Sequence, residues 1–176
     1  MVWKRTEEPA PKKAKVVHSA GKIMATVFWD SKGILLVDYL EHRTTINAAR
    51  YCEVLQRLRV AIKRKRPNLL TKGVLLMHDN ARPHSARQTQ ELLQSFYWDI
   101  FPHPPYSPDL APSDYHLFPK LKGFLGGKSF RNDEELKAAV GKYFREVGTQ
   151  HYEDGLRKLV PRFQKCIDRN GDYVEK

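Results

Sequence analysis

The chain contains 176 residues, of which 41% are hydrophobic and 29% are charged. This balance predicts one soluble globular domain with a sizeable core and argues against a disordered chain. Lys and Arg outnumber Asp and Glu by 31 to 20, so the formal net charge is +11. Such a charge favours a polyanionic partner, above all nucleic acid, with a generic basic surface as the plain alternative. No apolar run approaches the roughly 18 residues of a membrane helix, and the first residues do not resemble a signal peptide. We therefore expect no membrane association.

The cysteines and the first twenty residues give weaker signals. Cys52 and Cys166 lie far apart and outside any CxxC pattern. This spacing predicts reduced thiols of an intracellular protein rather than a disulfide or a zinc site. Residues 1–20 hold prolines and a basic cluster without apolar periodicity, so we expect a basic arm there. A nuclear-localisation signal is the weaker interpretation of that cluster.

Two β-prone runs come next, followed by a helical segment. "IMATVFW" and "ILLVDYL" flank the turn-forming "DSKG" and predict a hairpin over residues 23–40. Over residues 44–67 apolar side chains recur at helical spacing, and Pro67 is expected to stop the helix. "GVLLMHD", residues 73–79, is too short and apolar for a surface helix and predicts a strand buried on both faces.

Helices and a short strand follow this buried strand. "SARQTQELLQSF" predicts a helix over residues 85–96, and "WDIFPH" predicts a strand over 98–103. The proline-rich "PPYSPDLAPSD", residues 104–114, reads as a loop, and "YHLFPKLKGFL" predicts a helix over 115–125.

Two amphipathic helices are expected at the end of the chain. The first covers residues 132–147 and begins with a capping box, in which Asn132 is the N-cap and Glu135 stands three residues later. The second covers residues 151–168 and ends near an Asn-Gly pair. The whole order of elements predicts an α/β layered domain.

Two aspartates stand where such a domain places its ligands. Asp79 follows the buried strand, and in an open α/β sheet ligands bind beyond the carboxyl ends of the strands. Asp114 stands at the start of a helix, where backbone N–H groups favour a negative group. Taken singly, Asp79 fits a turn residue and Asp114 fits a helix cap in competition with Ser113. If the two carboxylates face each other, they need a cation between them, and oxygen ligands suit Mg²⁺ or Mn²⁺. On a basic protein, this arrangement suggests metal-assisted phosphoryl transfer on nucleic acid.

The segments around these aspartates resemble a known family. "HDNARPHSA" and "HPPYSPDLAPSDYHLF", with 34 residues between Asp79 and Asp114, are similar to the catalytic region of the mariner-type DNA transposases of the Tc/mariner superfamily. The likeness continues through "MATVFWDSKG", "TTINAARYCEVL" and "RFQKCIDRNGDYVE", so it covers nearly the whole chain. A double motif at this spacing is far more specific than a lone Asp-Asn pair.

This resemblance implies a fold, a chemistry and roles for individual residues. The implied fold is RNase H-like, and the implied activity is DNA cleavage and transfer with two divalent metal ions held by three aspartates. Asp79 matches the second aspartate and Asp114 the third. Asn80 and His84 belong to the same motif and are expected to orient the loop, with a structural turn role as the alternative.

The first aspartate of the family has no match in this sequence. The resemblance places it in a Gly-Asp-Glu segment on the first strand, which is central in the strand order 3-2-1-4-5, and no Gly-Asp-Glu occurs here. We therefore expect residues 21–176 to form an incomplete catalytic domain lacking that strand, preceded by a clamp-like arm over 1–20. Asp30 is rejected as a substitute because it falls in a turn, and Asp38 because it lies inside a strand. We expect low stability and negligible activity.

The resemblance also implies partners and a place of action. DNA is the expected partner, the arm over residues 1–20 is a candidate homodimer contact, and the nucleus is the expected location. A solvated helix face is the alternative reading of the basic stretches, and a non-catalytic DNA-binding or dimerisation module is the alternative function. An RNase H-like nuclease acting without transposon ends is a third reading. The candidate phosphate contacts are Arg57, Arg59, Lys63, Arg64, Lys65, Arg66, Lys120 and Lys122.

Overall fold

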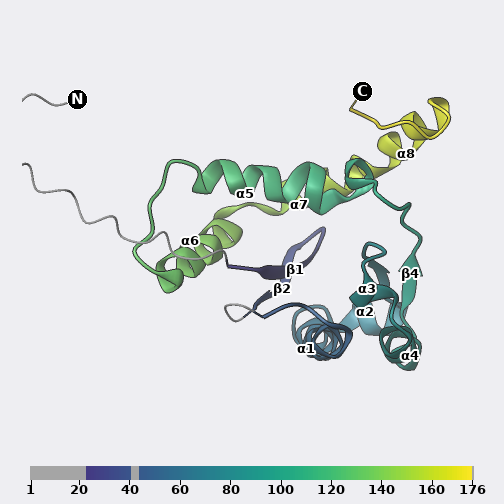
Figure 1. The fold of residues 1–176 in the computed structure, drawn as a ribbon, viewed down its shortest axis with the longest axis horizontal. Coiled ribbons are helices and arrows are strands. Elements are labelled where there is room, and N and C mark those ends of the chain that lie inside the picture. Colours follow the sequence, from purple (N-terminus) through teal and green to yellow (C-terminus); the bar gives the residue numbers. More distant parts are fainter. Residues whose placement is uncertain (1–22, 41–43, 176) are drawn as a thin grey trace, which may run out of the picture.

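The computed structural model describes residues 23–40 and 44–175 and has the predicted α/β character (Figure 1). The expected arm over residues 1–20 lies outside these residues. The chain forms a hairpin, a long helix, a second pair of strands separated by short helices, and a helical second half. No helix in the described part of the chain combines the length and apolarity that crossing a membrane requires.

The predicted hairpin is confirmed. Strands β1 (Ala25–Asp30) and β2 (Gly33–Tyr39) pair antiparallel. The Asp30 carboxylate accepts the Lys32 backbone N–H at 2.9 Å, which closes the turn. Gly33 has a φ of 124°, which a residue with a Cβ rarely adopts.

Helix α1 (Ala48–Lys65) is confirmed, and it ends before Pro67 as expected. Asn47 caps the helix by accepting the Arg50 N–H. A second short helix, α2 (Pro67–Lys72), begins at the proline itself. Proline suits the first position of a helix because its missing N–H would have no partner there. Pro67 therefore ends one helix and starts another.

The second pair of strands is shorter and more exposed than expected. Strand β3 (Leu75–Met77) pairs parallel with β4 (Asp99–Phe101). Leu75 is 62% exposed, so the prediction of a strand buried on both faces was wrong. Only the face of Leu76 packs into the core. The helix expected over 85–96 is α4 (Arg87–Ser95), and a separate short helix, α3 (Arg82–Ser85), precedes it.

The second half is helical, and its last predicted helix is in fact two. After a 3₁₀ turn at Pro108–Leu110 comes a π-helical turn, η2 (Ser113–Leu117), which runs into α5 (Phe118–Leu125). Helix α6 (Asp133–Glu146) has the predicted N-cap, since Asn132 accepts the Glu135 N–H at 2.9 Å. The last two helices are α7 (Thr149–Arg157) and α8 (Leu159–Asp168). Pro161 explains the break, because it has no N–H to continue a helix from α7.

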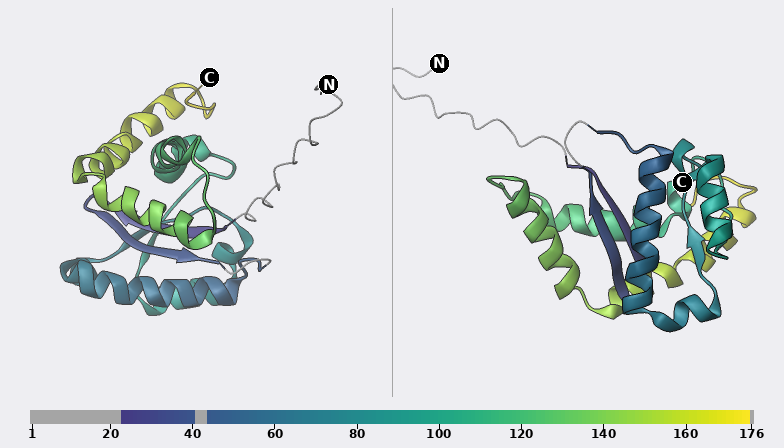
Figure 2. Two further views of the ribbon diagram at one scale, coloured as in Figure 1. Left: turned by 90° about the vertical axis from the view of Figure 1, so that its left-hand side faces the viewer. Right: turned by 90° about the horizontal axis from the view of Figure 1, so that it is seen from below.

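The hairpin lies between two apolar layers (Figure 2). Along β1 the side chains alternate between them, as the period of a strand requires. Phe28 and Leu35 join the core formed with α1, β3 and α4, whereas Val27, Trp29 and Val37 join the core formed with η2, α6 and α7. The molecule therefore has two half-cores that share the hairpin.

The two sheets remain separate within the described residues. The hairpin is one sheet, and β3 with β4 is the other. A cavity of about 1000 Å³ opens between them, lined by all of β1 and by β3. This arrangement is consistent with the expected RNase H-like fold, and no strand among the described residues pairs with the edges of β1 and β3 at the cavity.

Candidate metal centre

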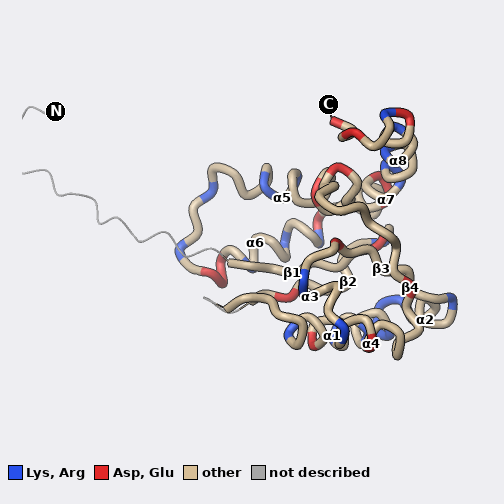
Figure 3. Tube along the Cα trace, turned by 45° about the vertical axis from the view of Figure 1, so that its right-hand side comes forward, with Lys and Arg blue, Asp and Glu red and all other residues tan. Residues whose placement is uncertain are grey.

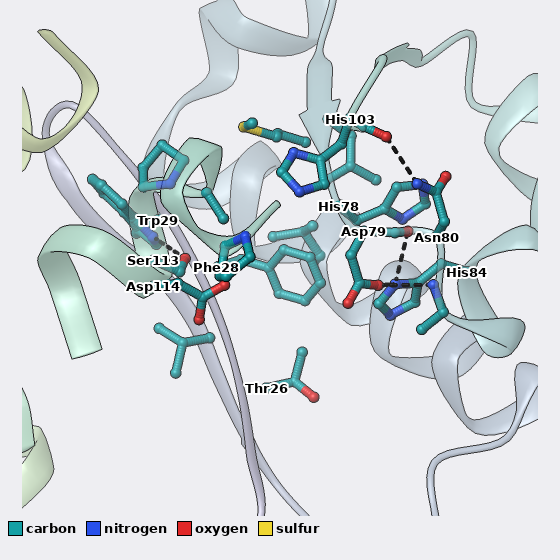
Figure 4. Close-up of a pocket in the computed structure, with 18 of the residues that line it drawn as sticks. Thr26, Phe28, Trp29, His78, Asp79, Asn80, His84, His103, Ser113 and Asp114 are labelled. Carbon is teal, nitrogen blue, oxygen red and sulfur yellow. Dashed lines mark hydrogen bonds and ion pairs between the residues drawn. The ribbon is translucent and has the colours of Figure 1, made fainter. Parts of the chain in front are cut away.

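Asp79 is held by contacts within its own motif (Figure 4). Its Oδ1 accepts the Ala81 backbone N–H at 3.0 Å and the His84 Nδ1–H at 2.6 Å. Helix α3 begins within this loop and brings His84 back over the aspartate. Five residues of sequence therefore suffice to orient this carboxylate, which is 64% exposed.

The surroundings of Asp79 favour its ionised form. Burial raises the pKa of the carboxyl, but the hydrogen bond from Ala81 and the charge and hydrogen bond of His84 outweigh it, so the pKa lies below the ordinary value. Asp79 is therefore a carboxylate at neutral pH and can offer its second oxygen to a cation.

Aromatic rings fix His84 in turn. The Tyr51 ring lies 4.2 Å from it, and the His78 ring stacks on it at 4.9 Å with an interplanar angle of 8°. Burial and the charge of His84 lower the pKa of His78 to about 4, so His78 is neutral at pH 7. Its Nδ1 forms a hydrogen bond with the Tyr51 hydroxyl at 3.0 Å. Helix α1, which carries Tyr51, is thereby tied to the Asp79 loop.

Asn80 connects the two halves of the motif. Its Nδ2 donates to the His103 carbonyl at 2.8 Å. His103 begins the proline-rich loop that ends at Asp114. This contact links the Asp79 loop directly to the segment that carries the second aspartate.

Asp114 projects from η2 into the cavity that Asp79 also lines. Burial and then the negative charge of Asp79 raise its pKa, and the positive charges of His103 and Lys122 oppose the rise. The negative charge of Asp79 therefore disfavours the ionised form of Asp114, and Figure 4 shows both residues on the same cavity. No described residue donates a hydrogen bond to Asp114.

Two carboxylates that line one cavity fit a divalent cation, but the described residues supply no third ligand. They contain no group of three or more His, Cys, Asp or Glu that could hold a metal ion. Asp30 is paired with Arg66 at 2.8 Å. Asp38 is buried and paired with Arg50 and Arg57. Neither therefore stands in as a third ligand.

The candidate phosphate contacts differ in what they already bind, and they lie on two separate elements, α1 and α5 (Figure 3). Three have structural partners: Arg57 pairs with Asp38, Lys65 donates to two carbonyls of β2, and Arg66 pairs with Asp30. Arg59 lies 4.7 Å from the Phe96 ring. Lys63 and Arg64 are exposed, as are Lys120 and Lys122 on α5. Of these basic residues, Lys122 lowers the pKa of Asp114 through its positive charge.

Two contributors to the site were missed from the sequence. The His103 carbonyl accepts a hydrogen bond from the Asn80 side chain, and His103 opposes the rise in the pKa of Asp114. The Trp29 indole donates to Ser113 Oγ at 3.0 Å, beside Asp114. Both contacts join segments far apart in the chain. The proximity of His103 to a proline-rich loop was the only local signal.

Comparison with known proteins agrees with this geometry. Residues 1–72 match a family model described as "Transposase (partial DDE domain)". The chain is 36% identical to the mariner Mos1 transposase of Drosophila mauritiana over 96% of its length, which is 49% of that protein. It is also 36% identical to the histone-lysine N-methyltransferase SETMAR of Homo sapiens, over 25% of that protein.

A solved structure carries the same likeness. The chain matches the crystal structure of the Mos1 catalytic domain with a TM-score of 0.84 and 38% identity, covering 86% of this chain and 76% of that one. The chain thus spans about half of the curated transposase and a quarter of the methyltransferase. It belongs to the mariner-type transposases, and it has the RNase H-like fold of their catalytic region.

Proposed function

We propose that this chain is the metal-binding part of a mariner-type catalytic domain, in which Asp79 and Asp114 hold Mg²⁺ or Mn²⁺ for DNA strand cleavage and transfer. One observation carries the proposal: the two aspartates line one cavity, and the charge of Asp79 raises the pKa of Asp114. Two like charges in such a place are stabilised by a cation. Mos1 catalytic-domain structures with Mg and with Mn support the choice of metal.

The residues of this chain divide the work between them. When bound, the divalent ions activate the attacking water or 3′-hydroxyl and stabilise the leaving oxygen. His84 and the Ala81 N–H hold Asp79 ionised and oriented. Asn80 sets the distance between the Asp79 loop and the proline-rich loop. Asp114 supplies the opposite carboxylate.

We further propose that this chain alone has negligible cleavage activity. Two carboxylates leave each metal ion with few protein ligands, so binding is weak and the scissile phosphate is poorly placed. Small errors of placement already cost orders of magnitude in rate. The lack of a third ligand in the described residues supports this expectation.

DNA is the proposed partner, and the nucleus the proposed place of action. The net charge of +11 supports it, as does a Mos1 paired-end complex with the left transposon end. Phosphate contacts are expected from the exposed members of the basic set, whereas Arg57, Lys65 and Arg66 serve first as structural pairs. A homodimer contact through residues 1–20 remains part of the proposal.

A non-catalytic DNA-binding or dimerisation module is the second candidate function. The incomplete ligand set favours it. A similar stretch also makes up a quarter of a human protein named for histone-lysine methylation. A transposase-like region therefore occurs inside a protein named for another activity.

A metal titration tests the first proposal. We expect the chain to bind Mn²⁺ weakly when the titration is monitored by electron paramagnetic resonance. Asp79→Asn and Asp114→Asn should each lower the Mn²⁺ affinity about tenfold or more. Asp99→Asn, an exposed aspartate at the start of β4, is the control and should bind like the wild type. Equal affinity in all four proteins would refute the metal centre.

Plasmid and duplex assays separate the two candidate functions. We expect no Mn²⁺-dependent nicking above background, whereas nicking that disappears in Asp79→Ala would overturn the proposed inactivity. Duplex DNA should bind with a steep salt dependence, and the Lys63→Ala/Arg64→Ala double variant should reduce its slope. A Lys142→Ala/Arg145→Ala double variant in α6 removes the same charge elsewhere and should leave the slope nearer to that of the wild type.

A further inference from the structure

We propose that residues 149–175 form a C-terminal brace that positions Asp114 opposite Asp79. The brace comprises α7, α8 and the tail that follows them. The inference rests on the proposed function of the two aspartates, and it makes Gly155 the principal positioning residue of the second one.

The brace fixes the residues on either side of Asp114. The Tyr115 hydroxyl donates to the Gly155 carbonyl at 2.8 Å, and His116 Nε2–H donates to the His151 carbonyl at 2.7 Å. On the other side, Ser113 accepts the Trp29 indole. A single π-helical turn is rare and often marks a functional site, and here side-chain bonds to α7 and β1 hold it.

Gly155 permits the close approach on which these bonds depend. A Cβ at this position would lie 2.6 Å from Cδ2 of His116 and 3.0 Å from Cη2 of Trp29. The first distance is far inside van der Waals contact, and both neighbours carry hydrogen bonds of the turn. Any larger residue must therefore push α7 away from η2 or break those bonds.

The tail holds the loop that precedes Asp114. The Val174 backbone N–H donates to Asp109 Oδ2 at 2.7 Å, and both residues are buried. Arg162 donates to the Asp109 carbonyl at 2.8 Å and lies 4.0 Å above the Tyr115 ring. The Tyr173 hydroxyl donates to the Tyr106 carbonyl at 2.9 Å. The loop and the turn are thus held by the same brace.

These contacts decide where Asp114 points, because its carboxylate receives no hydrogen bond from a described residue. The position of its carboxylate therefore depends on the position of η2, which the brace and Trp29 hold. Residues 149–175, which contain neither aspartate, thereby help to set the separation of the two carboxylates.

Gly155→Ala is the decisive variant. We expect Mn²⁺ affinity to fall about tenfold or more, as for loss of an outer partner of a metal ligand. The Trp29 indole N–H signal should shift in nuclear magnetic resonance spectra. Gly123→Ala in α5, where a Cβ meets nothing within 4 Å, is the matched control and should leave affinity and spectrum unchanged. Val140→Ala destabilises the same half-core but removes none of the hydrogen bonds that hold η2, and it should lower the melting temperature but not the affinity.

Two further variants keep the test sharp if Gly155→Ala fails to fold. Val174→Pro removes the N–H that Asp109 accepts, and Tyr115→Phe removes one donor; each should weaken Mn²⁺ binding by a smaller factor. Unchanged affinity in folded brace variants would overturn the brace while leaving the metal centre intact. If the wild type itself binds no Mn²⁺, the metal centre fails, and crystal structures of wild type and a folded brace variant decide the brace by whether Asp114 moves.

Discussion

The two aspartates are held in place by different kinds of contact, local for Asp79 and distant in the chain for Asp114. Asp79 is oriented by residues two and five positions away, within a single loop. Asp114 has no such local partner, and its turn is held by β1 and α7, which are 84 and 40 residues away in the chain. The orientation of Asp79 depends only on contacts within its own motif. The position of Asp114 depends on the whole second half-core, so different substitutions should disturb the two carboxylates.

Few contacts connect the part of the molecule that holds Asp79 with the part that holds Asp114. The hairpin and the β3–β4 sheet share no ladder among the described residues. The hairpin is bound to α1 by Lys65 and Arg66, and the Asp79 loop is bound to the Asp114 loop by Asn80. The halves are therefore coupled by side chains, where a complete sheet would couple them by backbone hydrogen bonds.

The largest expected effect concerns the stability of the whole chain. Open strand edges on the central cavity should leave the purified protein of low stability or prone to aggregate. We expect a broad melt that depends on concentration. A sharp cooperative melt of a monomer above about 60 °C, measured by calorimetry with light scattering, would contradict this expectation.

Matched core substitutions should separate the half-cores. Leu117 and Leu55 are both fully buried, the first in η2 and the second in α1. Replacement of either by Ala should cost about 2–5 kcal/mol. In urea unfolding followed by fluorescence, Leu117→Ala should shift the Trp29 signal more, and Leu55→Ala should shift the Trp98 signal more. Equal shifts of both signals in both variants would mean that the halves unfold as one unit.

The same contrast explains what could be predicted from the sequence. Helix α1, the hairpin and the capping of α6 follow from periodicity, turn residues and a capping box, which are all local. The grouping of Asp79 with Asn80 and His84 was likewise visible in one short motif. The exposure of Leu75 depends on what packs against it. The break between α7 and α8 follows from Pro161, a local signal that the prediction of one helix over 151–168 did not use. The resemblance to a family, rather than any pattern, paired Asp79 with Asp114.

The brace shows the limit more clearly. Nothing near Gly155 in the sequence points to Asp114, because the glycine acts through the space that it leaves for His116 and Trp29. A close approach of this kind is a property of the folded chain. Local patterns therefore identified the two carboxylates and the neighbours that hold Asp79, but not the residues that position Asp114.

Asn80→Ala tests the contact between the Asp79 loop and the proline-rich loop. Its expected effect on stability is smaller than that of the core substitutions. The variant removes a side-chain donor to the His103 carbonyl and should cost about 1 kcal/mol, the typical net value of such a hydrogen bond. Mn²⁺ affinity should fall as well, since the separation of the two loops is no longer fixed. Asn80→Asp, which cannot donate when ionised, should behave like Asn80→Ala in chemical denaturation. Full stability in both variants would show that the proline-rich loop is held by the brace alone.

The smallest effect has opposite signs at the two aspartates. The lowered pKa of Asp79 means that its charge stabilises the fold above the unfolded pKa, and this contribution is lost as the pH falls through the folded pKa. The raised pKa of Asp114 means that the folded state binds the proton more tightly, so stability is gained as the pH falls through the folded pKa.

Without metal at pH 7, Asp79→Asn should lower the melting temperature and Asp114→Asn should raise it. Both changes stay below about 1 kcal/mol because solvent screens these exposed groups. With Mn²⁺ the gain in Asp114→Asn should vanish, because the cation stabilises the wild-type pair that the variant has lost. A decrease in melting temperature for both variants without metal would mean that the two carboxylates do not repel each other, and the proposed cation site would lose its basis.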